Sequence, residues 1–267
     1  MSYQTKVVKL KNQRFLTACF SMALKKSHKW VVFLPESGSD FRTGDRKELV
    51  GLVGSHIAQK FNFLVINKPG VEQKKVDKKM FEKSFRHEKR IEDTLQALKA
   101  IIPAKDKIHL VGYSEGAYNT PVVARRDKRI ISISMIGGGT RGWMKEELSN
   151  ASAKEKSSYE RAIKGIYKKS HSTKKWNGFS YATWYSYRAD NTLRALKGLE
   201  LPALAILGAR DKVIDLKATI VDLVLVSERK PIQVHIFGDC GHHFSKHWKP
   251  VSRVLGRFLS EQEKIKS

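Results

Sequence analysis

The segment Lys107 to Thr120, KIHLVGYSEGAYNT, joins an apolar run to a serine flanked by glycines. An apolar run, Ile108 to Val111 with one histidine inside it, leads directly into Gly112 to Gly116, GYSEG, and then into residues able to open a helix. A bare G-x-S-x-G is weak, because ordinary glycine and serine frequencies produce it by chance in roughly one chain in ten of this length. Its position between a buried strand and a helix is more specific, because the glycines permit a tight turn that lifts a serine hydroxyl out at the strand end. Ser114 is therefore predicted to be a nucleophile; the alternative is an incidental turn serine.

Strands and helices alternate on both sides of this motif. Two short β-type segments, Lys6–Leu10 and Phe15–Met22, open the chain, and further apolar runs typical of buried strands lie at Trp30–Pro35, Phe63–Asn67, Ile108–Val111 and within residues 129–139, 201–211 and 231–244. Helical spacing or helix-forming composition is found at Arg46–Lys60, Arg86–Ile102, Ser114–Arg126, Leu216–Val226 and Trp248–Leu259. This alternation predicts an α/β fold with a mostly parallel, twisted sheet of about eight strands flanked by helices. In such a sheet, ligands bind at the carboxyl ends of the strands.

The alternation is interrupted between residues 141 and 196. This stretch is rich in lysine, predicted to be helical, and carries many aromatic residues, among them Trp143 and Trp184. We expect residues 1–267 to form a single domain and 141–196 to be a helical cap or lid insertion in it. The alternative is a solvated helical excursion whose aromatic residues only pack it onto the core.

Composition indicates a globular protein with an unusual charge. Lys and Arg number 51 against 26 Asp and Glu, a formal net charge of +25. Such a charge favours polyanions such as nucleic acid or an anionic membrane surface. Because the basic residues are spread along the whole chain without a dense tail, we favour an ordinary basic surface over a dedicated polyanion site.

Targeting and redox signals are few. Cys19 and Cys240 match neither a metal-ligand spacing nor a disulfide framework. Phe15–Leu24 superficially resembles a secretory signal, but it lacks a convincing cleavage site, so a core strand is favoured. No apolar run approaches the roughly 18 residues of a membrane span. We therefore predict a cytoplasmic protein without a transmembrane segment.

A nucleophilic serine needs a base, and the base needs a carboxylate to orient it. Asp211 follows the apolar run LAILGAR, and His242 and His243 lie in the loop GDCGHHFS after the last predicted strand. Ser114, Asp211 and the histidine pair thus each follow a strand of their own, which is far more specific than a single motif. Asp215 and Asp239 compete with Asp211 from less favourable positions.

The chain resembles the α/β-hydrolase superfamily of serine hydrolases over nearly its whole length, from WVVFLPESG through NKPGV, GYSEGA and LGARDKVID to GDCGHHF. GYSEGA is similar to the GHSEGG of bacterial esterases and serine aminopeptidase-like hydrolases. The resemblance implies an acyl-enzyme mechanism without cofactor or metal, in which Ser114 is the nucleophile, His242 the general base and then acid, and Asp211 the orienting carboxylate. His242 is preferred to His243 because it follows a glycine, as the family's histidine does.

The resemblance also implies an oxyanion hole made of two backbone N–H groups. One belongs to Glu115, and we place the other at Ser37, in the loop PESG after the strand WVVFLP. Glu36 stands where the family usually has a glycine. Its side chain is expected to face solvent or to pair with Arg42; the alternative is that Glu36 or Asp40 meets a cationic substrate group. Other candidate substrate contacts are Tyr113, His243, Trp143 and Trp184.

Two functions from different classes follow. The first is a serine hydrolase, carboxylesterase-like, that cleaves an ester, thioester or amide of a modest-sized, small-molecule acyl substrate. The second is a non-catalytic binding module that uses its basic surface to hold nucleic acid or an anionic membrane, which the presence of all three triad residues disfavours.

Overall fold

The computed structural model describes residues 4–10, 15–23, 26–38, 60–71 and 76–264. In this part of the chain, eight strands form one sheet in the order β1-β2-β4-β3-β5-β6-β9-β10. The strands are β1 (Gln4–Lys9), β2 (Phe15–Ser21), β3 (Lys29–Leu34), β4 (Asn62–Ile66), β5 (Lys107–Tyr113), β6 (Ile130–Ile136), β9 (Ala203–Gly208) and β10 (Ile232–Phe237). β1 and β2 pair antiparallel, and every neighbouring pair from β4 to β10 is parallel. The predicted, mostly parallel sheet is confirmed.

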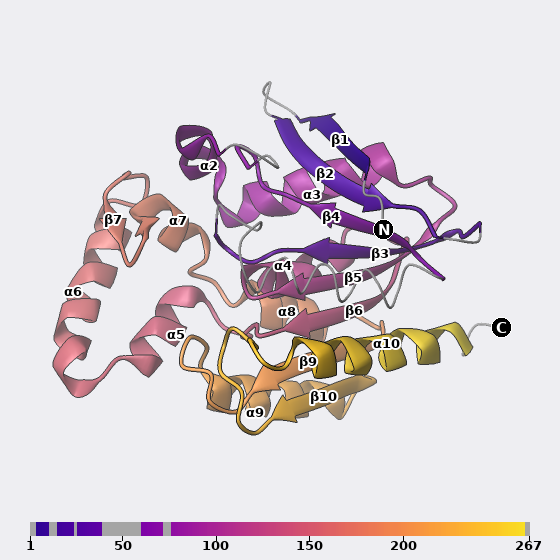
Figure 1. Ribbon diagram of the computed structural model, residues 1–267. Coiled ribbons are helices and arrows are strands. Elements are labelled where there is room, and N and C mark those ends of the chain that lie inside the picture. Colours follow the sequence, from indigo (N-terminus) through magenta and orange to yellow (C-terminus); the bar gives the residue numbers. More distant parts are fainter. Residues whose placement is uncertain (1–3, 11–14, 24–25, 39–59, 72–75, 265–267) are drawn as a thin grey trace.

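Helices cover both faces of the sheet (Figure 1). The core helices are α2 (Lys78–Ser84), α3 (His87–Ile101), α4 (Glu115–Ala124), α8 (Asn191–Lys197), α9 (Leu216–Ser227) and α10 (Trp248–Lys264). Along β3, Val31 and Phe33 pack with α10, whereas Val32 and Leu34 pack in the cluster that contains residues of α3, α4 and α9. Successive strand residues point to opposite faces, and both faces are buried, so β3 is a continuous apolar run.

The segment between β6 and β9 extends beyond the carboxyl ends of the strands (Figure 1). It contains α5 (Trp143–Asn150), α6 (Ala153–Lys168) and α7 (Tyr181–Ser186), followed by α8. A two-stranded hairpin, β7 (Lys175–Trp176) with β8 (Phe179–Ser180), lies within it. This hairpin was not expected in a stretch predicted to be helical. Aromatic residues of the segment between β6 and β9 form a small core of their own with Met144 and Ile166.

Several other expectations can be compared with the structure. Phe15–Ser21 is a sheet strand in which Leu16 and Ala18 are buried, as expected for a core strand. Helix α2, which was not predicted, begins where Asp77 accepts a hydrogen bond from the backbone of Met80. The predicted helix Arg46–Lys60 lies outside the described residues except for Lys60. Asp40 and Arg42 also lie outside them.

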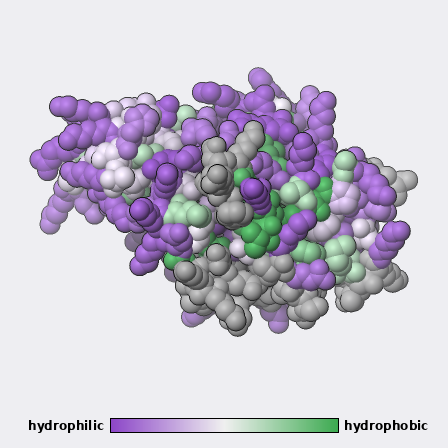
Figure 2. Space-filling model, turned by 90° about the horizontal axis from the view of Figure 1, so that it is seen from above, coloured by the Kyte–Doolittle hydropathy of each residue, from purple (hydrophilic) through white to green (hydrophobic). Residues whose placement is uncertain are grey.

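Hydrophilic side chains are spread over the face of the molecule shown in Figure 2, including the end where the segment between β6 and β9 lies, which is called the inserted segment below. Among the described residues, no helix is long and apolar enough to cross a membrane.

Candidate active site

Ser114 occupies a sharp turn between β5 and α4. Its φ is 51° and its ψ is −115°, values that cost a non-glycine residue about 1–3 kcal/mol. Gly116 allows this turn, because a Cβ at that position would collide with the carbonyl oxygen of Leu34 in the neighbouring strand. The turn directs the Ser114 hydroxyl away from the sheet, at the start of a helix.

Parallel pairing brings the other strand ends to the same edge. Leu34 at the end of β3 is in register with Gly112, and Tyr113 with Ile136 at the end of β6. The loop after β10 then crosses closely over the end of β9: the backbone N–H of Arg210 donates to the carbonyl of Cys240 at 2.8 Å. Gly208 permits this approach, because a Cβ there would collide with the same carbonyl. The loops that carry Asp211 and His242 are thereby held together.

A chain of hydrogen bonds joins the three predicted residues. Ser114 Oγ lies 2.9 Å from His242 Nε2, and His242 Nδ1 lies 2.8 Å from Asp211 Oδ2. The other carboxylate oxygen of Asp211 accepts from the backbone N–H of Val213 at 2.8 Å. A carboxylate facing Nδ1 favours the tautomer with its proton there, which leaves the Nε2 lone pair free to accept the serine proton. The side chain of Asp211 is fully buried.

The competing residues lie elsewhere. Asp215 caps α9 by accepting from the N–H of Ala218, and Asp239 is exposed and pairs with His247 at 2.9 Å. His243 is exposed, with its ring centroid 5.6 Å from that of His242. Of these residues, Asp211 and His242 hydrogen-bond to each other, and His242 also reaches Ser114.

The loop after β3 passes beside the turn at Ser114. Ser37 lines the cavity in front of Ser114, and Glu115 opens α4, where the first backbone N–H groups lack partners within the helix. Buried Lys68 donates to the carbonyl of Gly38 at 2.7 Å and so ties this loop to the end of β4.

Glu36 is buried, with 7% of its surface exposed. The expectation that it faces solvent is therefore wrong. It is not among the described residues that line the cavity.

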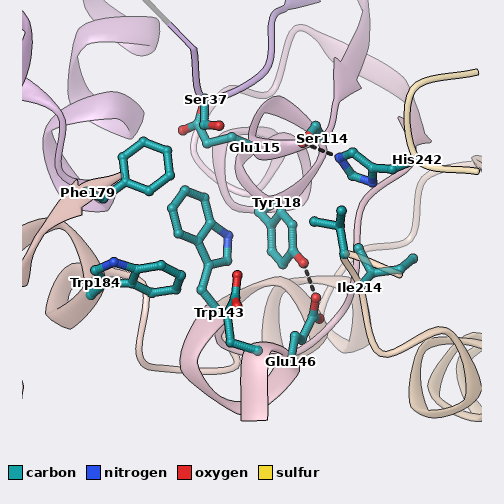
Figure 3. A pocket seen from close by; sticks show the side chains of 12 residues that line it. Ser37, Ser114, Glu115, Tyr118, Trp143, Glu146, Phe179, Trp184, Ile214 and His242 are labelled. Carbon is teal, nitrogen blue, oxygen red and sulfur yellow. Dashed lines mark hydrogen bonds between the residues drawn. The ribbon is translucent and has the colours of Figure 1, made fainter. Parts of the chain in front are cut away.

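The cavity at Ser114 has a volume of about 80 Å³. Figure 3 shows the side chains that surround it. It is lined by Ser37, Ser114, Glu115, Tyr118, Trp143, Glu146, Glu147, Phe179, Trp184, Val213, Ile214 and His242. Trp143 and Trp184, both predicted to contact substrate, are among these lining residues. Tyr113 and His243 were also predicted but do not line the described cavity; the buried hydroxyl of Tyr113 instead donates to the carbonyl of His242 at 3.3 Å.

Two cavity residues were missed by the sequence analysis, Tyr118 and Glu146. The Tyr118 hydroxyl donates to the buried carboxyl of Glu146, which also accepts from the backbone N–H of Arg141 at 3.1 Å. Burial raises the pKa of Glu146 to about 8, against the opposing effect of these hydrogen bonds. Tyr118 lies on α4, four residues after the N-cap Ser114, a spacing that signals a shared face. No local pattern singles out Glu146.

No group of three or more His, Cys, Asp or Glu side chains in the described ranges is placed to hold a metal ion.

Neither a protein-family model nor a curated protein sequence matches the chain. Solved structures do match. Mouse alpha/beta hydrolase domain-containing protein 10 superposes with a TM-score of 0.69 at 13% identity, over 99% of this chain and 100% of that one. Est1E from Butyrivibrio proteoclasticus gives 0.66 at 10% identity, over 97% and 99%. The Pyrococcus furiosus esterase Pf2001 gives 0.67 at 14% identity, over 97% and 92%.

These matches span nearly the whole of each chain, so they include the eight-stranded sheet of this protein and the helices that flank it. At such low identity they show the fold. The resemblance read from the sequence motifs is thus confirmed at this level: the chain has the α/β-hydrolase fold.

Proposed function

We propose that the protein is a serine hydrolase that cleaves an ester, thioester or amide of a modest-sized acyl substrate, with carboxylester hydrolysis as its main reaction. The observation that carries the proposal is the hydrogen-bonded chain from Ser114 Oγ through His242 to Asp211, with the serine held at a positive φ. A turn serine without a catalytic role needs neither this strained backbone nor an aligned imidazole.

The reaction follows from these atoms. Ser114 Oγ attacks the substrate carbonyl carbon while His242 Nε2 takes the hydroxyl proton, and the bond to the leaving group breaks as that group takes the proton from Nε2. Water then attacks the acyl-enzyme, again giving a proton to Nε2, and Ser114 recovers it. Asp211 stabilises the imidazolium in both halves.

The negative charge on the carbonyl oxygen needs hydrogen-bond donors. We assign the backbone N–H groups of Ser37 and Glu115 to this role, because both residues border the cavity at Ser114. Loss of one such donor typically costs about 10²–10³ in rate. We also propose that residues 141–196 form the cap of this site, since Trp143, Phe179 and Trp184 supply one wall of the cavity.

The test is covalent labelling by a fluorophosphonate probe. The wild type should be labelled and Ser114→Ala should not. Ser37→Ala is the matched control, because it removes the other serine hydroxyl of the cavity but keeps the backbone N–H; it should retain labelling. An unlabelled wild type, or equal labelling of wild type and Ser114→Ala, would rule out the mechanism.

A substrate panel resolves the class of acyl compound. p-Nitrophenyl esters of increasing chain length, an acyl-CoA and an aminoacyl amide separate esterase, thioesterase and peptidase activity. Because the cavity has room for only a few water-sized groups, short acyl chains should be preferred.

A further inference from the structure

The wall of the cavity that faces Ser114 from the inserted segment combines aromatic rings with carboxyl groups. Trp143, Phe179 and Trp184 lie together on one side, and Glu146 and Glu147 belong to the same helix as Trp143 (Figure 3). An aromatic wall with carboxylates beside it has the composition that recognises a cation.

The rings are held in place before any ligand arrives. Trp143 stacks on Tyr187 with centroids 3.9 Å apart and planes 10° apart, and its centroid is 5.7 Å from that of Trp184. The indole N–H of Trp184 donates to the carbonyl of Trp176 at 2.7 Å. A preorganised set of rings loses little conformational entropy when it binds a ligand.

Within the described part of the chain, the two carboxyl groups lack a cationic partner, although the protein has 51 Lys and Arg. Among the described residues, no ion pair joins Glu146 or Glu147 to a Lys, Arg or His side chain. Glu147 accepts a long hydrogen bond from Asn177, at 3.4 Å. By contrast Glu115, whose buried carboxyl points into the protein, lies 3.5 Å from the guanidinium of Arg90. Burial raises the pKa of both Glu146 and Glu147, as expected for carboxyl groups that no positive charge stabilises.

We propose that Trp143, Phe179 and Trp184, together with Glu146 and Glu147, bind a small ammonium group of the substrate, so that the enzyme prefers esters that carry a positive charge near the scissile bond. This inference rests on the proposed hydrolase function for its meaning in catalysis. The ring faces attract the cation through their quadrupoles, and the bound cation favours ionisation of the two neighbouring carboxyl groups, which then balance its charge. The net charge of +25 repels cations at long range, so the preference must arise within the cavity.

The kinetic test uses pairs of esters that differ only in charge. In the first pair, acetylcholine carries the charge on its alcohol group and 3,3-dimethylbutyl acetate is its neutral counterpart. In the second pair, p-nitrophenyl 3-aminopropanoate carries the charge on its acyl group and p-nitrophenyl butanoate is its neutral counterpart. The wild type should favour the charged member of at least one pair by about tenfold in kcat/KM. Glu147→Gln and Glu146→Gln should each reduce that ratio. Glu160→Gln, which removes an exposed charge on α6, should leave the ratio unchanged.

A binding test does not depend on turnover. Tetramethylammonium, titrated into Ser114→Ala, should change the tryptophan fluorescence and saturate, whereas tert-butanol should not. Equal rates within both ester pairs, or no saturable response to tetramethylammonium, would overturn the cation site while leaving the hydrolase proposal intact. If the wild type neither reacts with the fluorophosphonate nor hydrolyses any ester, the hydrolase proposal fails, and the fluorescence titration alone decides the cation site.

Discussion

Glu146 should make the protein less stable as the pH rises from about 4.5 to 8. Its pKa is 4.5 in an unstructured chain and about 8 in the folded protein, where burial disfavours the charged form. In this window the folded state holds a proton that the unfolded state releases, so the free energy of unfolding falls with increasing pH. Below pH 4.5 and above about 8 the contribution of Glu146 is constant.

The magnitude follows from the size of the shift. Each unit of pKa difference is worth about 1.4 kcal/mol, so the full shift corresponds to a loss of up to about 5 kcal/mol across the window. This is a large part of the roughly 5–15 kcal/mol that stabilises an ordinary domain. His87 acts with the opposite sign, because burial lowers its pKa, and its stabilising contribution is lost as the pH falls.

The measurement is urea unfolding followed by tryptophan fluorescence at pH 5, 6.5 and 8, for the wild type and for Glu146→Gln. The variant keeps His87 and every other titrating group, so the difference between the two slopes isolates Glu146. The absolute stability of Glu146→Gln is not the readout. In the wild type each carboxyl oxygen of Glu146 accepts one hydrogen bond, from Tyr118 or from the N–H of Arg141, and the amide of glutamine replaces one of these oxygens by an NH₂ group. Glu160→Gln should have the slope of the wild type. Equal slopes for wild type and Glu146→Gln would show that Glu146 binds its proton no more tightly in the folded than in the unfolded protein.

Three further substitutions test the geometry around Ser114. Lys68→Met removes the donor to the carbonyl of Gly38 and should lower kcat about 10–100-fold with little change in KM, because the loop that carries Ser37, the proposed oxyanion donor, then loses its tie to the end of β4; an unchanged kcat would show that this loop holds its conformation without that bond. Gly116→Ala should abolish activity and lower the melting temperature, since the new methyl group collides with the Leu34 carbonyl; a fully active, stable variant would contradict the assigned turn. Asp211→Asn should lower kcat for ester hydrolysis about 10⁴-fold while leaving the fold intact by circular dichroism, because the imidazole then adopts the wrong tautomer; a tenfold loss or less would argue against its assigned role.

Much of the fold could be predicted because it depends on local patterns. Runs that are buried on both faces, such as Trp30 to Leu34, are apolar throughout, and helices that cover them repeat apolar residues at helical spacing. The predicted ends of the elements were less accurate. Helix α10 continues to Lys264, beyond the predicted end at Leu259, and this extension was missed because the last turns of the helix are polar. The β7–β8 hairpin was missed because two-residue strands carry no periodic signal.

The candidate site, like the fold, could be predicted from the sequence only in part. The strand pattern of the sequence places Ser114, Asp211 and His242 each after a strand, and parallel strands bring their carboxyl ends to one edge of the sheet. The folded structure is needed to show that these side chains, 128 and 31 residues apart along the chain, lie within hydrogen-bond distance. It also decided that Glu36 is buried and that Glu146 reaches the cavity. The physical reason is that burial and contact depend on how loops and the inserted helices pack against distant segments, which no local spacing encodes.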